Sequence, residues 1–228
     1  MRTSQWSAWR PLVAALVGSI AVAAAAQSWT FDGDAQGWQA RDLTSYTEIG
    51  DASDVVWNET GGASGGYISK FDPSVRSYFL EAPIAAGSDY SSFVGGSLAF
   101  SLRSDFNDWV NDNVVIFRGV TGGVSTTIVT TVPVPDPTGA WLSYTVDLDA
   151  ANFHVGSRDG SAPSAVQFAE IMGSLSTFLL PGEFGNGVKE TTGIDSVRFT
   201  AIPEPSTYAA LVGGAALALV AIRRYRRR

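Results

Sequence analysis

Alternating hydrophobic and polar residues predict short β-strands over most of the chain between residues 27 and 200. SLAFSLRS places Leu98, Phe100 and Leu102 on one face of a strand. WLSYTVDL, which begins at residue 141, and GIDSVRFT, which begins at residue 193, alternate in the same way. NVVIFRG, which begins at residue 113, is a continuous apolar run, and that pattern is typical of a strand covered on both faces. Because Gly, Asp, Asn and Pro separate these segments, we expect turns between them.

Helical periodicity occurs in one segment, SAPSAVQFAEIMGSL, which covers residues 161–175. Ser161 and Pro163 suit the start of a helix, and Gly173 indicates that the helix is short. Four apolar side chains lie on one helical face: Ala165, Phe168, Met172 and Leu175. Many short strands with one helix predict a mainly β fold over residues 27–200, namely a β-sandwich of the jelly-roll type.

The first 26 residues have the parts of a secretory signal peptide. The start is basic, residues 12–22 are apolar, and Ala24 and Ala26 are the small side chains that signal peptidase requires. A membrane anchor is the alternative, but this apolar run is short and ends in alanines. We therefore expect cleavage after Ala26, so that the mature chain begins near Gln27.

The end of the chain, residues 201–228, combines a proline motif, an apolar stretch and a basic terminus. Pro203 and Pro205 end any preceding strand and hold Glu204 in an extended, exposed segment. The 15 apolar residues 208–222 fall short of the ~20 of a full membrane span, although snorkelling arginines extend their reach. Five arginines favour the cytoplasmic side and predict an N-out, C-in helix: Arg223, Arg224, Arg226, Arg227 and Arg228.

Together, the Pro-Glu-Pro motif, the apolar stretch and the terminal arginines resemble the PEP-CTERM sorting signal. In that family the tail is recognised and cut by exosortase, a membrane enzyme of Gram-negative bacteria. The resemblance implies transient insertion into the inner membrane, with signal peptidase and exosortase as processing partners. It also implies a final location on the cell surface or outside a Gram-negative cell. A permanent C-terminal anchor is the alternative.

The region between the two ends is strongly acidic. Residues 27–200 contain eight basic and 21 acidic residues, which gives a formal charge of −13. Such a surface repels nucleic acids and attracts cations, calcium among them, so no nucleic-acid partner is expected. The chain has no cysteine, which excludes disulfides, thiolate metal sites and thiol nucleophiles.

A second resemblance covers most of this acidic region. Six segments, in this order, resemble the laminin B domain (laminin domain IV): WTFDGDAQGW, GGYISKFDPSVRSYFLEAP, FVGGSLAFSLRS, WLSYTVDLD, FAEIMGSLSTFLLPGEF and GIDSVRF. The last motif usually reads Leu-Asp-Asn-Val in that family, whereas this chain keeps Asp195 but has Ser196 in place of Asn. The family implies a jelly-roll related to carbohydrate-binding modules, found in extracellular matrix and without established catalysis.

Catalytic sites find little support in the sequence. The one histidine, His154, lies in a loop-like stretch, and no Gly-x-Ser-x-Gly motif accompanies it, which argues against a Ser-His-Asp triad. A single histidine also excludes a histidine-based metal site. Paired carboxylates hydrolyse glycosides in many enzymes, but most acidic residues here lie in predicted turns, where Asp bonds its own backbone. We therefore expect no enzymatic activity.

Exposed aromatic residues are the candidates for sugar binding, because their rings stack on the apolar faces of sugars. Trp109 is the strongest candidate, since polar residues flank it in NDWVND; the alternative is a loop anchor that packs on the sheet. Trp57 and Tyr90 are further candidates. Trp38 and Trp141 are expected in the core, because they lie in strand-like positions.

A structural calcium ion is a further expectation. In jelly-roll carbohydrate modules such a site commonly joins the first and last strands, so the resemblance implies that Asp32 or Asp34 lies near Asp195. Calcium takes about six to eight oxygen ligands from carboxylates and backbone carbonyls. The alternative is an Asp-Gly turn that is held by backbone hydrogen bonds.

The sequence therefore predicts an exported, non-catalytic, adhesive or glycan-binding protein of a surface, biofilm or exopolysaccharide matrix. Two alternatives stay open because a fold does not fix a function. One is a glycan-processing hydrolase on the same sandwich. The other is a module that binds other matrix proteins and no sugar.

Overall fold

The computed structural model describes residues 26–72, 77–107, 113–185, 188–202, 213, 217, 219 and 222–224 of the 228-residue chain. The chain forms two compact units, Ala24–Ile202 and a second unit that combines Met1–Ala23 with Pro203–Arg228. In the second unit the described positions are helical and exposed, Arg223 and Arg224 included. No helix among the described residues has the length and apolar character needed to cross a membrane.

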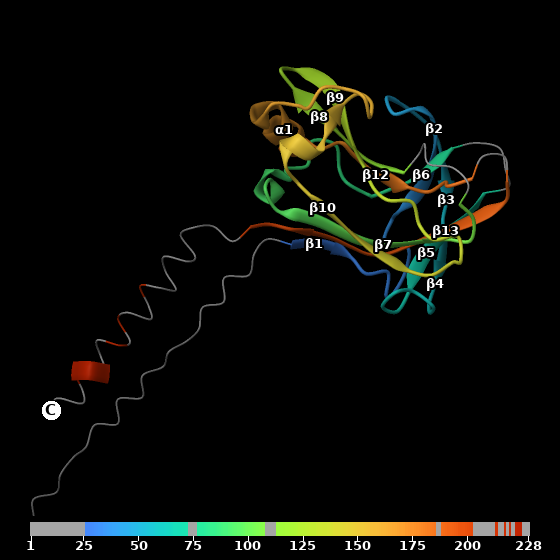
Figure 1. Cartoon of the computed structure of the whole chain (residues 1–228), viewed down its shortest axis with the longest axis horizontal. Helices are drawn as coiled ribbons and strands as arrows, with labels where there is room; N and C mark the ends of the chain where they lie inside the picture. Colours follow the sequence, from blue (N-terminus) through green and yellow to red (C-terminus); the bar gives the residue numbers. More distant parts are fainter. Residues whose placement is uncertain are drawn as a thin grey trace, which may run out of the picture. The chain divides into compact units, whose positions relative to one another are not determined.

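Two antiparallel sheets pack face to face in the first unit (Figure 1). Sheet A has the strand order β10 (Leu142–Asp147), β7 (Ser97–Ser104), β13 (Glu190–Thr200), β5 (Tyr67–Asp72) and β4 (Val56–Asn58), and β1 (Ala26–Trp29) also pairs with β13. Sheet B has the order β11 (His154–Val155), β9 (Val124–Thr131), β8 (Val114–Thr121), β12 (Thr177–Pro181), β6 (Tyr78–Glu81), β2 (Gln39–Ser45) and β3 (Glu48–Asp54). The predicted mainly β sandwich is confirmed.

Aromatic side chains fill the core between the sheets. Phe178 from β12 and Phe199 from β13 meet across the sandwich with ring centroids 5.1 Å apart, and Phe117 from β8 lies 5.2 Å from Phe178. Leu98 and Leu102 of β7 face this core, as their alternation predicts. Because rings of this size bury a large apolar area, this cluster supplies much of the hydrophobic stabilisation.

Strand β8 is covered on both faces, as its continuous apolar run predicts. Val115 and Phe117 face the core between the sheets, whereas Val114 and Ile116 belong to a second cluster on the outer face of sheet B. The other buried members of this second cluster are Phe79, Val129 and Leu179. Strands β2 and β3 form a hairpin whose side chains cover the cluster: Leu43, Tyr46 and Ile49.

One short helix, α1 (Ala165–Met172), completes the sandwich beside β8 (Figure 1). Its N-cap is Ser164, whose hydroxyl accepts a hydrogen bond from Gln167 N while the Gln167 side chain accepts one from Ser164 N. This capping box satisfies two backbone donors, which is why the helix begins three residues after Ser161. Phe168 and Met172 are buried, as predicted. Two 3₁₀ turns also occur, at Ser91–Phe93 and Ala150–Asn152.

The two tryptophans expected in the core differ. Trp38 is buried between Trp29 and Phe178. Trp141 is not a core residue: it is half-exposed, and its indole N–H donates to Gly61 O at 2.9 Å. The physical reason is space on the outer face of sheet A, where a Cβ at Gly193 would lie only 3.1 Å from Trp141 Cη2.

Candidate functional site

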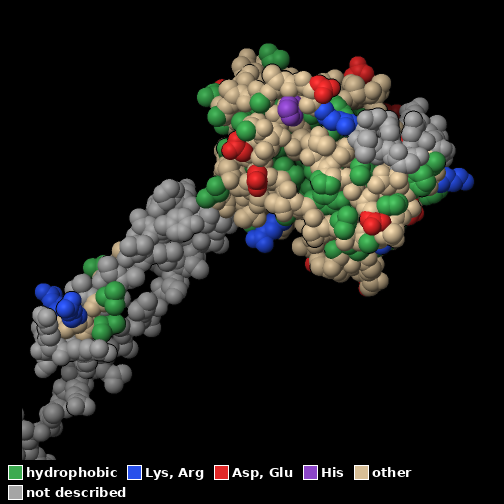
Figure 2. Space-filling model, in the orientation of Figure 1, with side chains coloured by type: hydrophobic (Ala, Val, Ile, Leu, Met, Phe, Trp, Pro, Cys, Tyr) green, Lys and Arg blue, Asp and Glu red, His purple; other side chains and the backbone are tan. Residues whose placement is uncertain are grey.

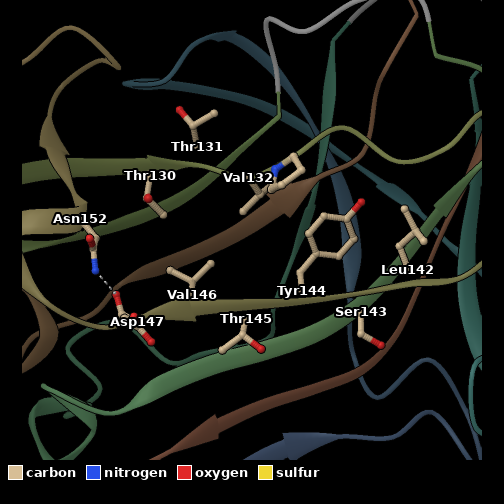
Figure 3. A pocket seen from close by; sticks show the side chains of 11 residues that line it. Thr130, Thr131, Val132, Leu142, Ser143, Tyr144, Thr145, Val146, Asp147 and Asn152 are labelled. Atoms are coloured by element: carbon tan, nitrogen blue, oxygen red, sulfur yellow. Dashed lines mark hydrogen bonds between the residues drawn. The ribbon is translucent and has the colours of Figure 1, made fainter.

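A groove of about 530 Å³ runs along one edge of the sandwich, where the edge strand β10 of sheet A faces the end of β9 in sheet B. Figure 3 shows the side chains that line this β9–β10 groove. Because β10 pairs with a neighbour on one side only, the other edge of its backbone is turned toward the groove.

Apolar side chains form the floor of the groove. Val132, Tyr144 and Val146 line it and also belong to the core, so the floor is held by packing from below. The Tyr144 ring stacks on Phe100 with centroids 5.2 Å apart and an interplanar angle of 8°. A floor of this kind is rigid, because its rings and branched side chains are fixed by the surrounding core.

The Tyr144 hydroxyl is the one polar group of this floor, and it makes no hydrogen bond with the described residues. The side chain is only 7% exposed, and burial raises the pKa of Tyr144 to about 12. The phenol is therefore a neutral hydrogen-bond donor at any physiological pH. A buried hydroxyl without a partner costs about 1–3 kcal/mol, so the floor has unmet capacity for one hydrogen bond.

Uncharged polar side chains line the rest of the groove. Asn152 Nδ2 donates to Asp147 O at 3.3 Å, which fixes the amide at one end of the groove. The hydroxyl groups come from both walls: Thr130, Thr131, Ser143 and Thr145. Asp147 is the single carboxylate in the lining, so the groove holds no pair of acids for glycoside hydrolysis. Hydroxyls above an apolar floor suit a neutral, hydroxyl-rich ligand.

Two carboxylates do share a second hollow, of about 440 Å³, beside the β2–β3 hairpin. Asp42 and Asp51 line it together with Leu43, Thr44 and Ser77. The lining contains no aromatic ring on which a sugar would stack. Elsewhere on the face shown in Figure 2, Asp and Glu side chains are spread singly among uncharged polar surface.

The aromatic residues that the sequence singled out do not gather at the groove. Tyr90 is 8% exposed and packs against Phe93 and Phe199, so it is a core residue and no sugar-binding side chain. Trp57 on β4 is half-buried, and its indole N–H donates to Phe31 O at 2.7 Å. This bond ties the side chain to the chain that follows β1. Trp109 lies outside the described residues.

Tyr144 and Phe71 are the aromatic residues that sequence reasoning missed. Phe71 on β5 is 52% exposed on the outer face of sheet A, opposite Thr191 of β13. The alternation in YISKFD was the signal for it, because that alternation places Phe71 on the face opposite Ile68. Tyr144 carried no such signal, since its hydroxyl lies at the groove only through the pairing of distant strands.

The three carboxylates predicted to share calcium do not form one site. Asp34 Oδ1 accepts a hydrogen bond from Gln36 N at 2.7 Å, which is the turn geometry of the alternative. Asp195 is buried, and its Oδ2 accepts one from Ser64 N at 2.8 Å. Within the described part of the chain, the only three carboxylates with oxygens within 4.8 Å of one another are a different set.

A glycine loop at residues 61–66 explains this result. A Cβ at Gly62 would lie 2.8 Å from Asp195 Oδ2, and a Cβ at Gly65 would lie 2.9 Å from Asp32 Oδ1, so the loop contacts both carboxylates. Asp195 Oδ1 makes no hydrogen bond with the described residues. It is the one carboxylate oxygen there that a cation held mainly by backbone carbonyls would use.

The remaining predicted residues are placed as follows. His154 on β11 is half-buried, and its Nδ1 lies 2.8 Å from Gly160 O, so this ring nitrogen carries a proton that it donates to a backbone carbonyl. Ala26 and Gln27, at the expected cleavage site, are exposed in β1 and pair with Thr200 and Phe199 of β13. The other predicted positions lie outside the described residues: Ala24, Pro203, Glu204, Pro205, Arg226, Arg227 and Arg228.

No protein-family model and no curated protein sequence matches this chain. Its structure is similar to the L4b domain of human laminin alpha-2, with a TM-score of 0.61 and 14% identity over 78% of this chain and 98% of that domain. It is also similar to the family 11 carbohydrate-binding module of a cellulosomal cellulase of Clostridium thermocellum. For that module the TM-score is 0.50 and the identity 12%, over 80% of this chain and 98% of the module. At these identities the likeness shows a shared fold, that of a two-sheet sandwich.

Proposed function

We propose that this chain is a non-catalytic glycan-binding module and that the β9–β10 groove binds its polysaccharide. The observation that carries the proposal is the chemistry of the groove, in which four hydroxyl side chains and an amide surround a rigid apolar floor with an unpartnered phenol. A sugar presents the matching surfaces, since its ring has apolar faces and a rim of hydroxyls.

The acidic surroundings favour a neutral polysaccharide. Residues 27–200 carry a formal charge of −13, which repels polyanionic glycans over the range of the Debye length. The likeness to a carbohydrate-binding module supports the same conclusion at the level of fold. Binding without catalysis is consistent with the single carboxylate of the groove.

Export and sorting belong to the same proposal. The N-terminal segment, read as a signal peptide, and the C-terminal tail, read as a PEP-CTERM signal, support a protein that signal peptidase and exosortase process at the inner membrane. The body then works at the surface or in the exopolysaccharide matrix of a Gram-negative cell. In the described part of the body β1 pairs with β13, so the sandwich is closed by the residues that adjoin the two processed ends.

Affinity electrophoresis of the full chain in a mild non-ionic detergent tests the proposal. The gels contain mixed-linkage β-glucan, laminarin or the host's own exopolysaccharide. Thr131→Trp fills the groove from its exposed wall, whereas Ser125→Trp puts the same side chain at the exposed start of β9, away from the groove. We expect at least one polysaccharide to retard the wild type and Ser125→Trp, and Thr131→Trp to bind about tenfold more weakly or not at all.

Equal mobility of all three proteins in every gel overturns glycan binding and leaves protein partners, which the free edge of β10 would receive as an added strand. Retardation that Thr131→Trp retains overturns the groove as the site.

A hydrolase is the second candidate, and the hollow that contains Asp42 and Asp51 is the observation that favours it. Incubation of the full chain with the retarding polysaccharide, followed by measurement of new reducing ends, separates the two functions. We expect no release above background. Release that Asp51→Asn abolishes and Thr131→Trp leaves intact would instead establish an enzyme.

A further inference from the structure

Three buried carboxylates meet where sheet A and sheet B come together at the end of β5. Asp72 is the last residue of β5, Glu183 lies two residues after β12, and Glu190 is the first residue of β13. One oxygen from each lies within 4.8 Å of the others. All three side chains are at most 4% exposed. Buried carboxylates at this spacing are rare, because each loses its hydration and repels the other two.

Hydrogen bonds fix two of these carboxylates. Glu183 Oε2 accepts a hydrogen bond from Tyr78 N at 3.2 Å, and Glu190 Oε1 accepts one from Phe184 N at 2.7 Å. Glu190 Oε2 is fully buried and makes no hydrogen bond with the described residues, although the side chain is only 1% exposed. The backbone therefore aims the acidic side chains at one another and leaves one oxygen without a donor.

The electrostatics of this acidic cluster call for a positive charge. Burial raises the pKa of Glu190 to about 8, and the charges of Glu183, Asp72 and Asp105 raise it further, while the hydrogen bond from Phe184 acts against them. A proton on one carboxylate relieves part of the repulsion. A divalent cation at the centre relieves more, because it attracts every carboxylate at once.

We propose that Asp72, Glu183 and Glu190 bind one divalent cation, with Ca²⁺ as the expected ion. Carboxylate oxygens are hard ligands that suit Ca²⁺ and Mg²⁺, and Ca²⁺ accepts an irregular set of oxygens more readily than Mg²⁺ does. The ion ties the end of β5 in sheet A to the chain that leaves β12 in sheet B. This site is distinct from the Asp195 pocket and is independent of glycan binding.

The competing explanation is a cation supplied by the protein itself. Arg76 follows Asp72 by four positions in the sequence and lies outside the described residues. An arginine in that role makes the fold indifferent to added metal. The response to Ca²⁺ therefore separates the two explanations.

The test uses the full chain in a mild non-ionic detergent, stripped with EDTA, dialysed and titrated with Ca²⁺ or Mg²⁺ while the midpoint of thermal unfolding is followed. We expect saturating Ca²⁺ to raise the midpoint of the wild type by about 5–10 °C. Glu190→Gln keeps an oxygen for the Phe184 N–H and removes one ligand charge, so it should fold, and its Ca²⁺ response should be lost. Glu59→Gln makes the same change at an exposed position and should respond as the wild type does.

Equilibrium dialysis with ⁴⁵Ca²⁺ gives a second readout that does not depend on unfolding. We expect Glu190→Gln and Asp72→Asn each to bind one Ca²⁺ fewer than the wild type, and Asp195→Asn to keep this site. A wild type with no Ca²⁺ response, or a Glu190→Gln variant with an undiminished response and stoichiometry, overturns the proposal.

Discussion

The outer face of sheet B and the β9–β10 groove lie on the same sheet, yet the chain treats them in opposite ways. On the outer face, the second hydrophobic cluster is covered by the β2–β3 hairpin. At the groove, polar side chains and a phenol without a partner stay open to solvent and ligands. The chain thus covers apolar surface with its own hairpin, which stabilises the fold, and leaves polar surface uncovered, where binding remains available.

Hydrogen bonds reinforce the closed face. Arg118 Nη2 donates to the carbonyl oxygens of Tyr46 at 3.3 Å and Thr47 at 2.8 Å, at the tip of the hairpin. Arg158 Nε donates to Tyr46 Oη at 3.1 Å. No comparable set of bonds crosses the groove in the part of the chain that the structure describes, where Asn152 bonds only the backbone beside it. The closed face should therefore unfold late, and the groove should adapt at little cost.

Phe79→Ala should show the largest effect, because it removes a side chain that is 1% exposed within the covered cluster. We expect a loss of about 3 kcal/mol in the free energy of unfolding, from lost burial and the cavity that remains. Phe71→Ala is the matched control, since the same side chain is lost from an exposed position and should cost less than about 1 kcal/mol. Urea titration followed by tryptophan fluorescence measures both. Equal losses would contradict the distinction between a closed and an open surface.

Arg118→Ala should have a smaller effect that is confined to the hairpin. Loss of its hydrogen bonds to the hairpin carbonyls should cost about 1–2 kcal/mol. Hydrogen exchange should become faster in residues 43–49 and stay unchanged in β10. Arg198→Ala, at an exposed position of β13, is the control and should alter neither segment. Faster exchange throughout both sheets would show that the hairpin is no separate cover.

Tyr144→Phe should leave stability unchanged or raise it by up to about 1 kcal/mol, because the hydroxyl that it removes has no partner. Tyr78→Phe provides the contrast, since the Tyr78 hydroxyl donates to Lys70 O at 3.1 Å and its loss should cost about 1 kcal/mol. Thermal unfolding of the two variants measures the difference. A clear destabilisation by Tyr144→Phe would mean that its hydroxyl already has a partner.

The smallest effect concerns pH. Burial raises the pKa of Tyr144 to about 12 in the folded chain, above its ordinary value of about 10. The stability that the protonated phenol contributes is therefore fully present below pH 10 and is lost only as the pH rises through 12. Glycan binding at the groove should accordingly stay constant between pH 6 and pH 9, as measured by affinity electrophoresis. A fall in affinity across that range would place a different titrating group in the site.

Local pattern was sufficient to predict much of the fold. Period-two alternation located β7, and the continuous apolar run identified β8 as a strand with two covered faces. The helix was predicted from its apolar spacing, although its capping box moved the start to Ser164. These features depend on neighbours along the chain, which is why the sequence alone reveals them.

The candidate sites depend on neighbours that are distant in sequence. The groove exists because β10 lies at the edge of sheet A opposite the end of β9, and nothing near Thr131 or Tyr144 indicates this. Asp72 meets Glu190 only because β5 pairs with β13 in that register. Trp141 left the core because a glycine on another strand made room for it. Register and close approach are tertiary properties, and single-sequence reasoning does not reach them.

The most direct test of glycan binding at the groove is hydrogen exchange of the full chain with and without the polysaccharide that retards it in the gels. Residues 130–133 and 142–147 should exchange more slowly in the complex, because the ligand covers the free edge of β10. Residues 43–49 should exchange at the same rate in both samples. Protection of the hairpin, or of the outer face of sheet A around Phe71, with no change in β10 would contradict the account.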